Sequence, residues 1–430
     1  MSARKPILKR INQIMNSEGF TKAIAPVLLH LPIDSIKKNI IKSKIEAAQG
    51  CRKVTSSPYK GVINVTNKCN YRCKICEIHH VHKKYPLHYP NTLDLPTFKR
   101  LNPILKNLYL LDFYGNIGEP LTNPDFVNIV RHVRHNFGSR MFLNTNGSLL
   151  DTSTSSSLLS EQLDEILVSL HAASEETYSK LIGGNFKQVT DNIAAMTATK
   201  EYYKLKKPEI GIAFALNQLN AHENEAIVNL TTKLKADYLQ VSHYYHGLNA
   251  FEKDISFRNQ PERGNARLNS IYNYAKILGQ IRRKKITVLP KERPYLDTAS
   301  CEDTQRCFEP WSTIKIEGCP EHKDSHYISV CNRIMLLRLN YTKFDFTRFH
   351  ETLWNHPYLQ YMRASVNSEG RNPICAFCKH PETASIRNID NKEYRTRRDE
   401  AMHSFWEQAE AFSTSPEVKG LYKLTENPYK

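Results

Sequence analysis

The sequence predicts an α/β fold, a partial (βα)6 TIM-like barrel followed by a small cysteine-rich C-terminal module. From residue 61 onward, short apolar runs alternate with stretches of helical periodicity, which indicates consecutive βα units around a parallel sheet. Six of the apolar runs have the length of a strand. Residues 301–380 then contain six of the ten cysteines, together with turn residues and aromatics, which is typical of a small metal-stabilised module.

The barrel elements follow one another in a regular order. The expected strands are residues 62–65, 108–113, 141–144, 166–170, 210–216 and 238–242. The expected helices are residues 97–107, 125–136, 152–163, 175–181, 187–203 and 222–235. Asn123-Pro124, and Ser174 followed by two glutamates, are helix-start signals. Catalytic groups of such barrels sit at the carboxyl ends of the strands, so each loop directly after a strand is a candidate site.

The segments around the barrel complete a four-part organisation. We expect a helical extension over 1–58, the barrel over 59–290, the cysteine-rich module over 291–385 and a partly helical tail over 386–430. The extension contains two amphipathic helices with isoleucines on one face and lysines nearby. Packing of these helices against the barrel is preferred to a peripheral membrane contact.

Composition excludes several classes of protein. With 430 residues, 40% hydrophobic and 24% charged, the chain is neither disordered nor fibrous. The formal charge of +17 is spread thinly, and its densest runs are not interleaved with aromatics, so a solvated basic surface is preferred to a nucleic-acid site. Since the sequence has neither an apolar run of about 18 residues nor the apolar core of a signal peptide, we expect a cytoplasmic protein.

Three cysteines follow the first expected strand. Cys69, Cys73 and Cys76 form a CxxxCxxC motif in the loop at the catalytic rim. Three thiolates can bind three irons of a 4Fe-4S cubane and leave the fourth iron open to another ligand. On spacing alone, a zinc knuckle with His79 or His80 as the fourth ligand stays an alternative.

This motif and its place after the first strand resemble the radical S-adenosylmethionine (SAM) superfamily, over most of residues 60–380. The resemblance implies a redox-active 4Fe-4S cluster bound by Cys69, Cys73 and Cys76, which passes one electron into SAM and releases a 5′-deoxyadenosyl radical. It also implies that Ile75, where relatives commonly carry an aromatic residue, shields the adenine edge.

The later strand ends carry the other residues that the resemblance assigns to SAM. The second strand runs into YGNIGEP, which is similar to the family's GGEP element, with Ile117 in place of the first glycine. The implied SAM contacts are Gly118, Glu119, Pro120, Asn144, Thr145, Asn146, Ser169, His171 and Asn220. His171 stands where relatives often have Asp, so a histidine satisfied within the rim stays open. Asn220 could equally cap the following helix.

The C-terminal cysteines resemble a second cluster site. Their order is similar to the twitch form of the SPASM domain. It runs from a cysteine through two strands around a Gly turn to a second cysteine, and then through a Trp-Asn helix to a CxxC. The resemblance implies one auxiliary 4Fe-4S cluster bound by Cys307, Cys331, Cys375 and Cys378, with Cys319 as the competitor for the second position. A four-cysteine zinc ribbon is the alternative for this module.

The resemblance therefore implies a radical SAM oxidoreductase or maturase. We expect hydrogen abstraction from a small molecule, such as a sugar or natural-product precursor, with a net oxidation or epimerisation. The implied partner is a reducing electron donor such as flavodoxin or ferredoxin. A peptide-modifying maturase is the first alternative, and a non-enzymatic cluster or zinc protein that binds nucleic acid is the second.

Overall fold

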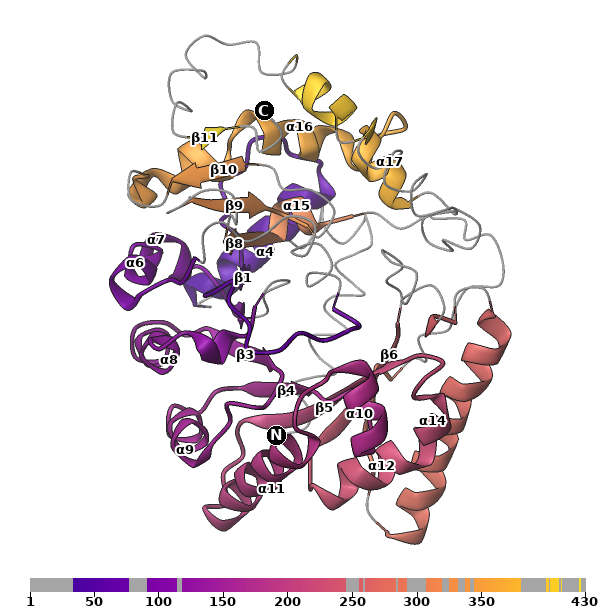
Figure 1. The fold of residues 1–430 in the computed structure, drawn as a ribbon. Helices are drawn as coiled ribbons and strands as arrows, with labels where there is room; N and C mark the ends of the chain where they lie inside the picture. The colour runs from indigo at the N-terminus through magenta and orange to yellow at the C-terminus, as the bar shows by residue number, and fades with distance from the viewer. Residues whose placement is uncertain are drawn as a thin grey trace.

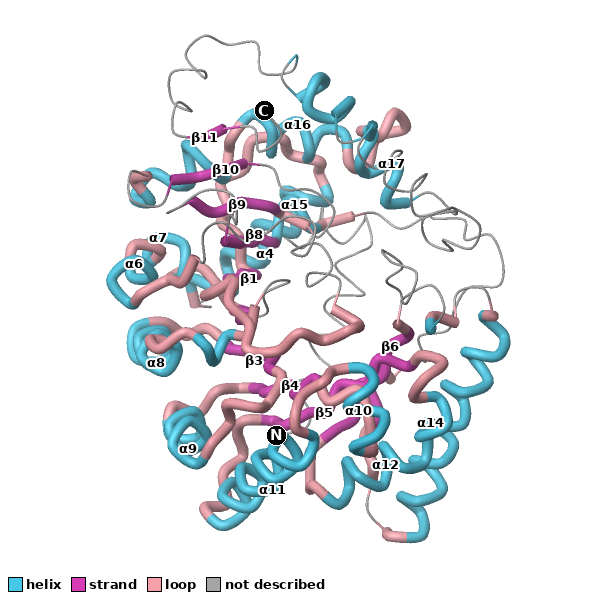
Figure 2. Tube along the Cα trace, in the orientation of Figure 1, coloured by secondary structure: helices cyan, strands magenta, loops and turns pink. Residues whose placement is uncertain are grey.

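A computed structural model describes residues 34–76, 91–113, 118–244, 255–257, 260–283, 285–291, 307–318, 325–331, 337–340, 344–379 and short stretches between 400 and 426. Their strands form one eleven-stranded sheet in the order β11-β10-β9-β8-β1-β2-β3-β4-β5-β6-β7 (Figures 1 and 2). Helices flank the sheet along one side of the arc in Figure 1.

The expected series of βα units is confirmed. Its parallel strands are β1 (Lys60–Ile63), β2 (Leu110–Phe113), β3 (Arg140–Thr145), β4 (Glu165–Ser169), β5 (Glu209–Leu216), β6 (Tyr238–His243) and β7 (Val288–Leu289). The helices between them are α6 (Leu95–Lys99), α7 (Asn102–Leu105), α8 (Phe126–Asn136), α9 (Thr152–Ser160), α10 (Glu175–Leu181), α11 (Phe186–Tyr202), α12 (Asn224–Lys233) and α14 (Pro261–Ile281). One helix was expected over 97–107, where the structure has α6 and α7. Pro103 has no N–H to bond the carbonyl of Lys99, which ends the first helix.

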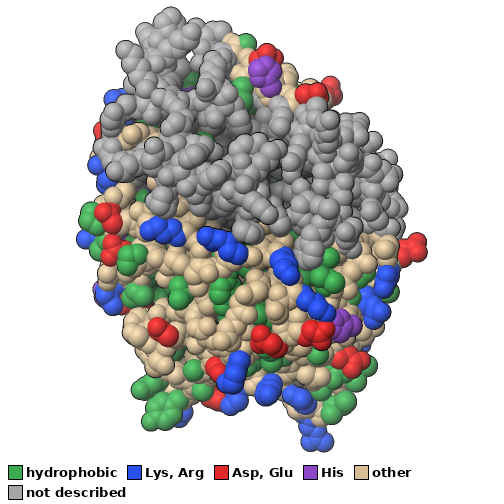
Figure 3. Space-filling model, viewed as in Figure 1, with side chains coloured by type: hydrophobic (Ala, Val, Ile, Leu, Met, Phe, Trp, Pro, Cys, Tyr) green, Lys and Arg blue, Asp and Glu red, His purple; other side chains and the backbone are tan. Residues whose placement is uncertain are grey.

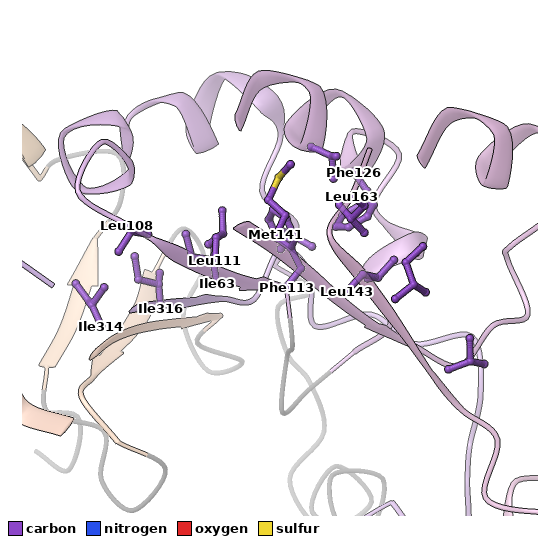
Figure 4. Close-up of a cluster of buried hydrophobic side chains, with 14 of the residues drawn as sticks. Ile63, Leu108, Leu111, Phe113, Phe126, Met141, Leu143, Leu163, Ile314 and Ile316 are labelled. Carbon is purple, nitrogen blue, oxygen red and sulfur yellow. The ribbon is translucent and has the colours of Figure 1, made fainter. Parts of the chain in front are cut away.

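Alternation along the strands separates an apolar outer face from an inner face that carries both polar and apolar side chains. Ile63, Leu111, Phe113, Met141 and Leu143 are at most 1% exposed and point toward the helices (Figure 4). Successive side chains of a strand point to opposite faces, so the residues between them face the concave side of the arc. This alternation leaves polar side chains available at the inside of the barrel.

The C-terminal module continues the barrel sheet. Its first strand, β8 (Thr313–Gly318), pairs in parallel with β1, and β9 (Ser325–Ser329), β10 (Leu337–Asn340) and β11 (Thr425–Glu426) follow in antiparallel order. Ile314 and Ile316 join the same apolar core as β1 and β2 (Figure 4). The module and the barrel therefore share one sheet and one core.

The chain before β1 is bound by side chains of the C-terminal module. Trp354 donates its indole N–H to the carbonyl of Ser56, at 2.9 Å, and Trp311 donates in the same way to Cys51. Asn355 both accepts from the N–H of Val54 and donates to its carbonyl, at 2.8 Å each. Helix α4 (Ser35–Ala48) packs on α15 (Glu309–Ser312), so the described part of the N-terminal extension packs against the rest of the chain.

Arg363, in α16 (Pro357–Ser365), lies at the centre of this junction. Its side chain is only 2% exposed and lies over the ring of Trp354, at 4.7 Å from the ring centroid. The guanidinium donates to the carbonyls of Pro310, at 3.0 Å, and Arg52, at 3.2 Å. Burial lowers the pKa of Arg363 to about 9, so the group is still charged at neutral pH.

Charged side chains are distributed over the surface, and the tail contributes buried aromatics. Basic side chains on the face shown in Figure 3 stand apart and are interspersed with acidic ones. The described part of the tail includes Phe405 and Trp406, both buried, whose rings contact Tyr361 and Tyr358 of α16. No helix among the described residues is long and apolar enough to cross a membrane.

We expect Arg363→Met to lower the free energy of unfolding by about 2–4 kcal/mol, because the carbonyls of Pro310 and Arg52 lose their donor. Urea unfolding followed by circular dichroism measures this loss. The matched control is Arg348→Met, which removes a 3.0 Å ion pair to Glu351 between two exposed side chains. That pair should contribute at most about 0.5 kcal/mol. Equal losses in the two variants would contradict a structural role for the buried guanidinium.

Candidate active site at the carboxyl end of the sheet

The CxxxCxxC loop begins just beyond the carboxyl end of β1. Cys69, Cys73 and Cys76 are all partly buried, and the N–H of Cys76 donates to the carbonyl of Cys73 at 3.1 Å. The end of α10 holds this loop, because the carbonyl of Leu181 accepts from the N–H of Lys74 at 2.9 Å. The cysteines thus occupy the place where a barrel of this type carries its catalytic groups.

The three thiols influence one another electrostatically. Burial, together with the neighbouring Cys76 and Cys69, raises the pKa of Cys73 to about 12. Burial also raises the pKa of Cys69, while the N–H of Tyr71, which donates to its sulfur at 3.5 Å, opposes this shift. The thiols of Cys69 and Cys73 are therefore protonated at neutral pH until a metal displaces their protons.

The loop after β2 approaches the cysteine loop closely. Gly118 has φ +96°, and a Cβ at this position would lie 2.3 Å from the carbonyl oxygen of Thr66. The next N–H, of Glu119, donates to the carbonyl of Lys68 at 2.7 Å. Only glycine fits this approach, which gives a physical reason for the glycine of the YGNIGEP element. Residues 114–117 of that element lie outside the described residues.

Glu119 joins the loops after β2 and β3. Its carboxylate is buried and accepts from the hydroxyl of Thr145 at 2.6 Å and from the N–H of Asn146 at 2.7 Å. Burial raises the pKa of Glu119, and these hydrogen bonds oppose the rise. Its oxygens are thus engaged within the protein, which makes Glu119 a brace of the rim.

A ring of three side chains connects β3 to the cysteine loop. Asn146 donates to Asn70 at 2.9 Å, Asn70 donates to the hydroxyl of Ser148 at 2.8 Å, and Ser148 donates back to Asn146 at 2.6 Å. Asn70 is next to Cys69 in the chain and was missed by our sequence analysis. The ring brings the predicted residue Asn146 to the cysteine loop.

The predicted residues of β3 and β4 meet on the inner face. The hydroxyl of Ser169 donates to the side-chain oxygen of Asn144 at 2.9 Å. Each lies at or next to the carboxyl end of its strand. Their donors and acceptors suit recognition of a polar group without a change of charge.

His171 is a neutral histidine of the rim. Burial lowers its pKa to about 4, and its Nδ1 accepts from the N–H of Ala215 at 3.1 Å. Since Nδ1 is an acceptor, the proton of the neutral ring is on Nε2. The residue has φ +58°, a left-handed backbone conformation that is uncommon outside glycine.

Asn220 joins the loops after β4 and β5. It is fully buried, accepts from Asn217 N–H at 2.8 Å, and donates to the carbonyls of His171 and Ala215 at 2.9 Å each. The side chain makes no helix-capping hydrogen bond. Its amide is engaged by the backbone of the rim, which supports the backbone of His171.

An ion pair that our sequence analysis missed lies on β8. Lys315 Nζ and Glu317 Oε1 are 2.8 Å apart, and the side chains are only 4% and 6% exposed. They alternate with Ile314 and Ile316 of the outer core, so they face the inside of the arc. The N–H of Asn64 donates to the carbonyl of Ile316 at 2.9 Å, which sets the pair beside the start of the cysteine loop.

Two of the C-terminal cysteines are tethered to one segment. Asn367 accepts from the N–H of Cys307 and donates to its carbonyl, at 2.9 Å each. Asn372 accepts from the N–H of Cys375 at 2.9 Å and donates to its sulfur at 3.2 Å. Cys375 lies in α17 (Pro373–Lys379). Cys319 and the side chain of Cys378 lie outside what the structure describes.

In the β8–β9 hairpin, Cys331 lies at the end that is distant from the CxxxCxxC loop. It follows β9, which runs antiparallel to β8 and ends with Ser329 opposite Lys315. Because β8 runs parallel to β1, this end of β9 is level with the start of β1, whereas Cys69 follows the end of β1.

Part of the chain matches a known family of sequences. Residues 63–201 match the model of the Radical SAM superfamily. The chain is 25% identical over 182 residues to a tungsten-containing aldehyde ferredoxin oxidoreductase cofactor-modifying protein of Pyrococcus furiosus, covering 42% of this chain and 50% of that protein. It is 32% identical over 126 residues to a GTP 3′,8-cyclase of Microcystis aeruginosa, covering 28% and 37%. The chain thus spans half or less of the length of these relatives.

Solved structures share the fold. Streptococcus suis SuiB bound to the precursor peptide SuiA matches with a TM-score of 0.51 at 13% identity, covering 89% of this chain and 88% of that one. The structure of anSMEcpe bound to AdoMet matches with a TM-score of 0.51 at 14% identity, covering 85% and 100%. The predicted partial barrel is confirmed as a fold by these likenesses.

The superfamily implies a 4Fe-4S cluster and SAM, and the chemistry of the rim fits both. Three mutually interacting thiols supply soft ligands, and the close approach at Gly118 exposes backbone groups beside them. In the described part of the chain, no three His, Cys, Asp or Glu side chains converge on the position of a single ion. A cubane does not require such convergence, because each of its thiolates binds a different iron. Residues 63–201 of this chain are thus similar to a radical SAM superfamily domain.

Proposed function

We propose that this chain is a cytoplasmic radical SAM oxidoreductase that abstracts hydrogen from a small molecule. The observation that carries the proposal is the set of three interacting thiols, carried by a loop that is hydrogen-bonded to the loops after β2 and β3. When bound, the cluster and SAM supply the one-electron chemistry that makes a hydrogen-abstracting carbon radical. A donor such as flavodoxin or ferredoxin would provide the electron.

The protein's own residues would bind and orient these groups. Cys69, Cys73 and Cys76 would each bind one iron, and the buried side chain of Ile75 would cover the adenine. The backbone around Gly118 to Pro120, with Glu119 as a brace, would face the SAM amino group.

Polar side chains of β3, β4 and the β5 loop would complete the SAM site. Asn144 and Ser169 would hydrogen-bond the ribose or carboxylate, and His171 would present its Nε2–H. Thr145 and Asn220 would act by fixing the loops. Asn146 combines both roles, since it holds Asn70 beside Cys69. Water exclusion would follow from the close contact between these loops.

We propose an auxiliary 4Fe-4S cluster bound by Cys307, Cys331, Cys375 and Cys378. The tethering of Cys307 and Cys375 to the segment around Asn367 and Asn372 supports this set. The length of β8 separates the two cysteine sites, and six residues of a strand span about 20 Å. At that separation the auxiliary site would accept an electron from the reaction rather than touch the substrate, which suits a net oxidation.

The substrate that we propose is a polar small molecule, such as a sugar or another natural-product precursor. The inner face beside the cysteine loop carries the buried Lys315–Glu317 pair, which can bind either sign of charge. Relatives of this chain are named as a GTP 3′,8-cyclase, a nucleotide dehydratase and a cofactor-modifying protein, which supports a small molecule. The peptide bound by SuiB makes a peptide the second candidate.

Anaerobic reconstitution should give about eight irons per chain, two cubanes, and reductant-driven formation of 5′-deoxyadenosine. The triple variant Cys69→Ala, Cys73→Ala, Cys76→Ala should retain about four irons and lose all SAM cleavage, because only the auxiliary ligands remain. Iron counting and chromatography of the products measure both. Stoichiometric zinc in the wild type, without SAM cleavage, would overturn the proposed function.

The complementary variant Cys307→Ala, Cys331→Ala, Cys375→Ala should also retain about four irons, yet continue to cleave SAM. Cys51→Ala is the matched control, since Cys51 is also partly buried but belongs to neither set. The control should retain all the iron. Loss of SAM cleavage together with the auxiliary iron would show that these cysteines do not form an independent site.

A cell extract should increase 5′-deoxyadenosine formation if it contains the substrate. We expect the activity in the dialysable fraction, and we expect it to survive protease treatment, because a small molecule has no peptide bonds to cleave. The assay compares both fractions before and after proteolysis, with the Cys69→Ala variant as the blank. Stimulation that is retained by the membrane and lost on proteolysis would instead favour the peptide-modifying enzyme.

A further inference from the structure

Tyr244 contacts the cysteine loop from a strand that lies far from β1 in the sheet order, at the same carboxyl end of the parallel strands. It follows β6, and its N–H continues the pairing with β5 by donating to the carbonyl of Leu216 at 2.9 Å. Its side chain is 5% exposed, and its hydroxyl donates to the carbonyl of Ile75 at 2.9 Å. The two residues are 169 positions apart in the chain. One phenol therefore connects the end of β6 to the loop that follows β1.

The position of this phenol is fixed by its own surroundings. The hydroxyl of Ser256 donates to the carbonyl of Tyr244 at 2.9 Å. Gln218, after β5, in turn donates through its side chain to the carbonyl of Ser256 at 3.0 Å and through its N–H to that of Ile255 at 2.7 Å. A donor held in this way is preorganised and costs little further ordering.

The accepting carbonyl belongs to the peptide group between Ile75 and Cys76. The N–H of that same peptide donates to the carbonyl of Cys73 at 3.1 Å. The phenol, the 75–76 peptide and the Cys73 carbonyl thus form a continuous chain of hydrogen bonds between two of the three cysteines. Such bonds polarise one another, so a donor at one end strengthens the dipole of the next group.

We propose that Tyr244 is a positioning residue of the cluster site, whose hydroxyl fixes the 75–76 peptide and raises the reduction potential of the cluster bound there. This inference rests on the proposed function, because it requires a cluster at Cys69, Cys73 and Cys76. A donor bound to the loop that holds a centre gaining negative charge withdraws electron density from that loop, which favours the reduced state. The ring alone would fill the space equally well, so the hydroxyl is the part that matters.

The test is Tyr244→Phe in the full chain, reconstituted anaerobically and titrated with reductant while the electron paramagnetic resonance (EPR) signal is recorded. Only the SAM-dependent part of the signal is followed, which isolates this cluster from the auxiliary one. We expect the reduction equilibrium to shift about fivefold toward the oxidised state, which is about 40 mV for a one-electron couple. The SAM-induced change in the signal should also differ from that of the wild type.

Tyr238→Phe is the matched control. Tyr238 begins the same strand, is 3% exposed and donates its hydroxyl to Glu165, at the other end of β6 from Tyr244. The control removes a phenolic hydrogen bond from a similarly buried side chain and should leave the potential unchanged. A second variant, Ser256→Ala, removes the hydrogen bond to the Tyr244 backbone and should shift the potential in the same direction by a smaller amount.

The outcomes separate the two proposals. A wild type that binds no SAM-responsive cluster overturns the proposed function and this inference with it. A wild type with the cluster, and a Tyr244→Phe variant with the same potential and signal, overturns this inference alone. Selective loss of the SAM-responsive cluster from a Tyr244→Phe variant that is as stable as Tyr238→Phe supports the positioning role.

Discussion

The rest of the structure depends on the parallel pairing of β1 with strands on both of its sides. β1 is hydrogen-bonded to β2 and to β8, which follows it by about 250 residues, and the contact continues past its end where Asn64 donates to Ile316. A strand that is paired on both edges is held in one register, because a slip by one residue would turn its core side chains inward. The loop that starts from β1 therefore leaves the sheet at a fixed point. The chain before β1 is equally constrained, since Trp354 and Asn355 hold residues 54–56.

The rim is built mainly from hydrogen bonds between side chains and the backbone of neighbouring loops. Glu119 joins the loops after β2 and β3, and Asn220 joins those after β4 and β5. Each is a buried polar group with its partners within the protein, as the cost of burying an unpaired group requires. Residues of the predicted motifs can therefore shape the site by fixing its loops. Asn220 also supports the backbone of its neighbour His171, whose carbonyl accepts from the Asn220 amide.

Much of this architecture follows from local sequence signals, and the remainder from contacts that have none. The strands were predicted because apolar runs of strand length alternate with helical periodicity, and the cysteine loop because its spacing is specific. The pairing of β8 with β1 was missed, because a partner so far along the chain leaves no local pattern. The same holds for Tyr244, Asn70 and the Lys315–Glu317 pair, whose roles depend on side chains meeting across the sheet. Pro103 shows the opposite error, since the apolar periodicity concealed a residue that breaks the helix.

The electrostatics of the cysteine loop explain how the chain can fold before it binds iron. Below the ordinary pKa of a cysteine, the Cys73 thiol is neutral in both the folded and the unfolded chain, so its burial carries no charge penalty. As pH rises from that value toward about 12, only the unfolded chain ionises, and the metal-free fold loses stability. At neutral pH the loop can thus be preformed by Leu181, Glu119 and Tyr244 while its thiols retain their protons. Iron then has to displace those protons, so the loop's affinity for iron must increase with pH, and the preformed loop contributes the geometry rather than the charge.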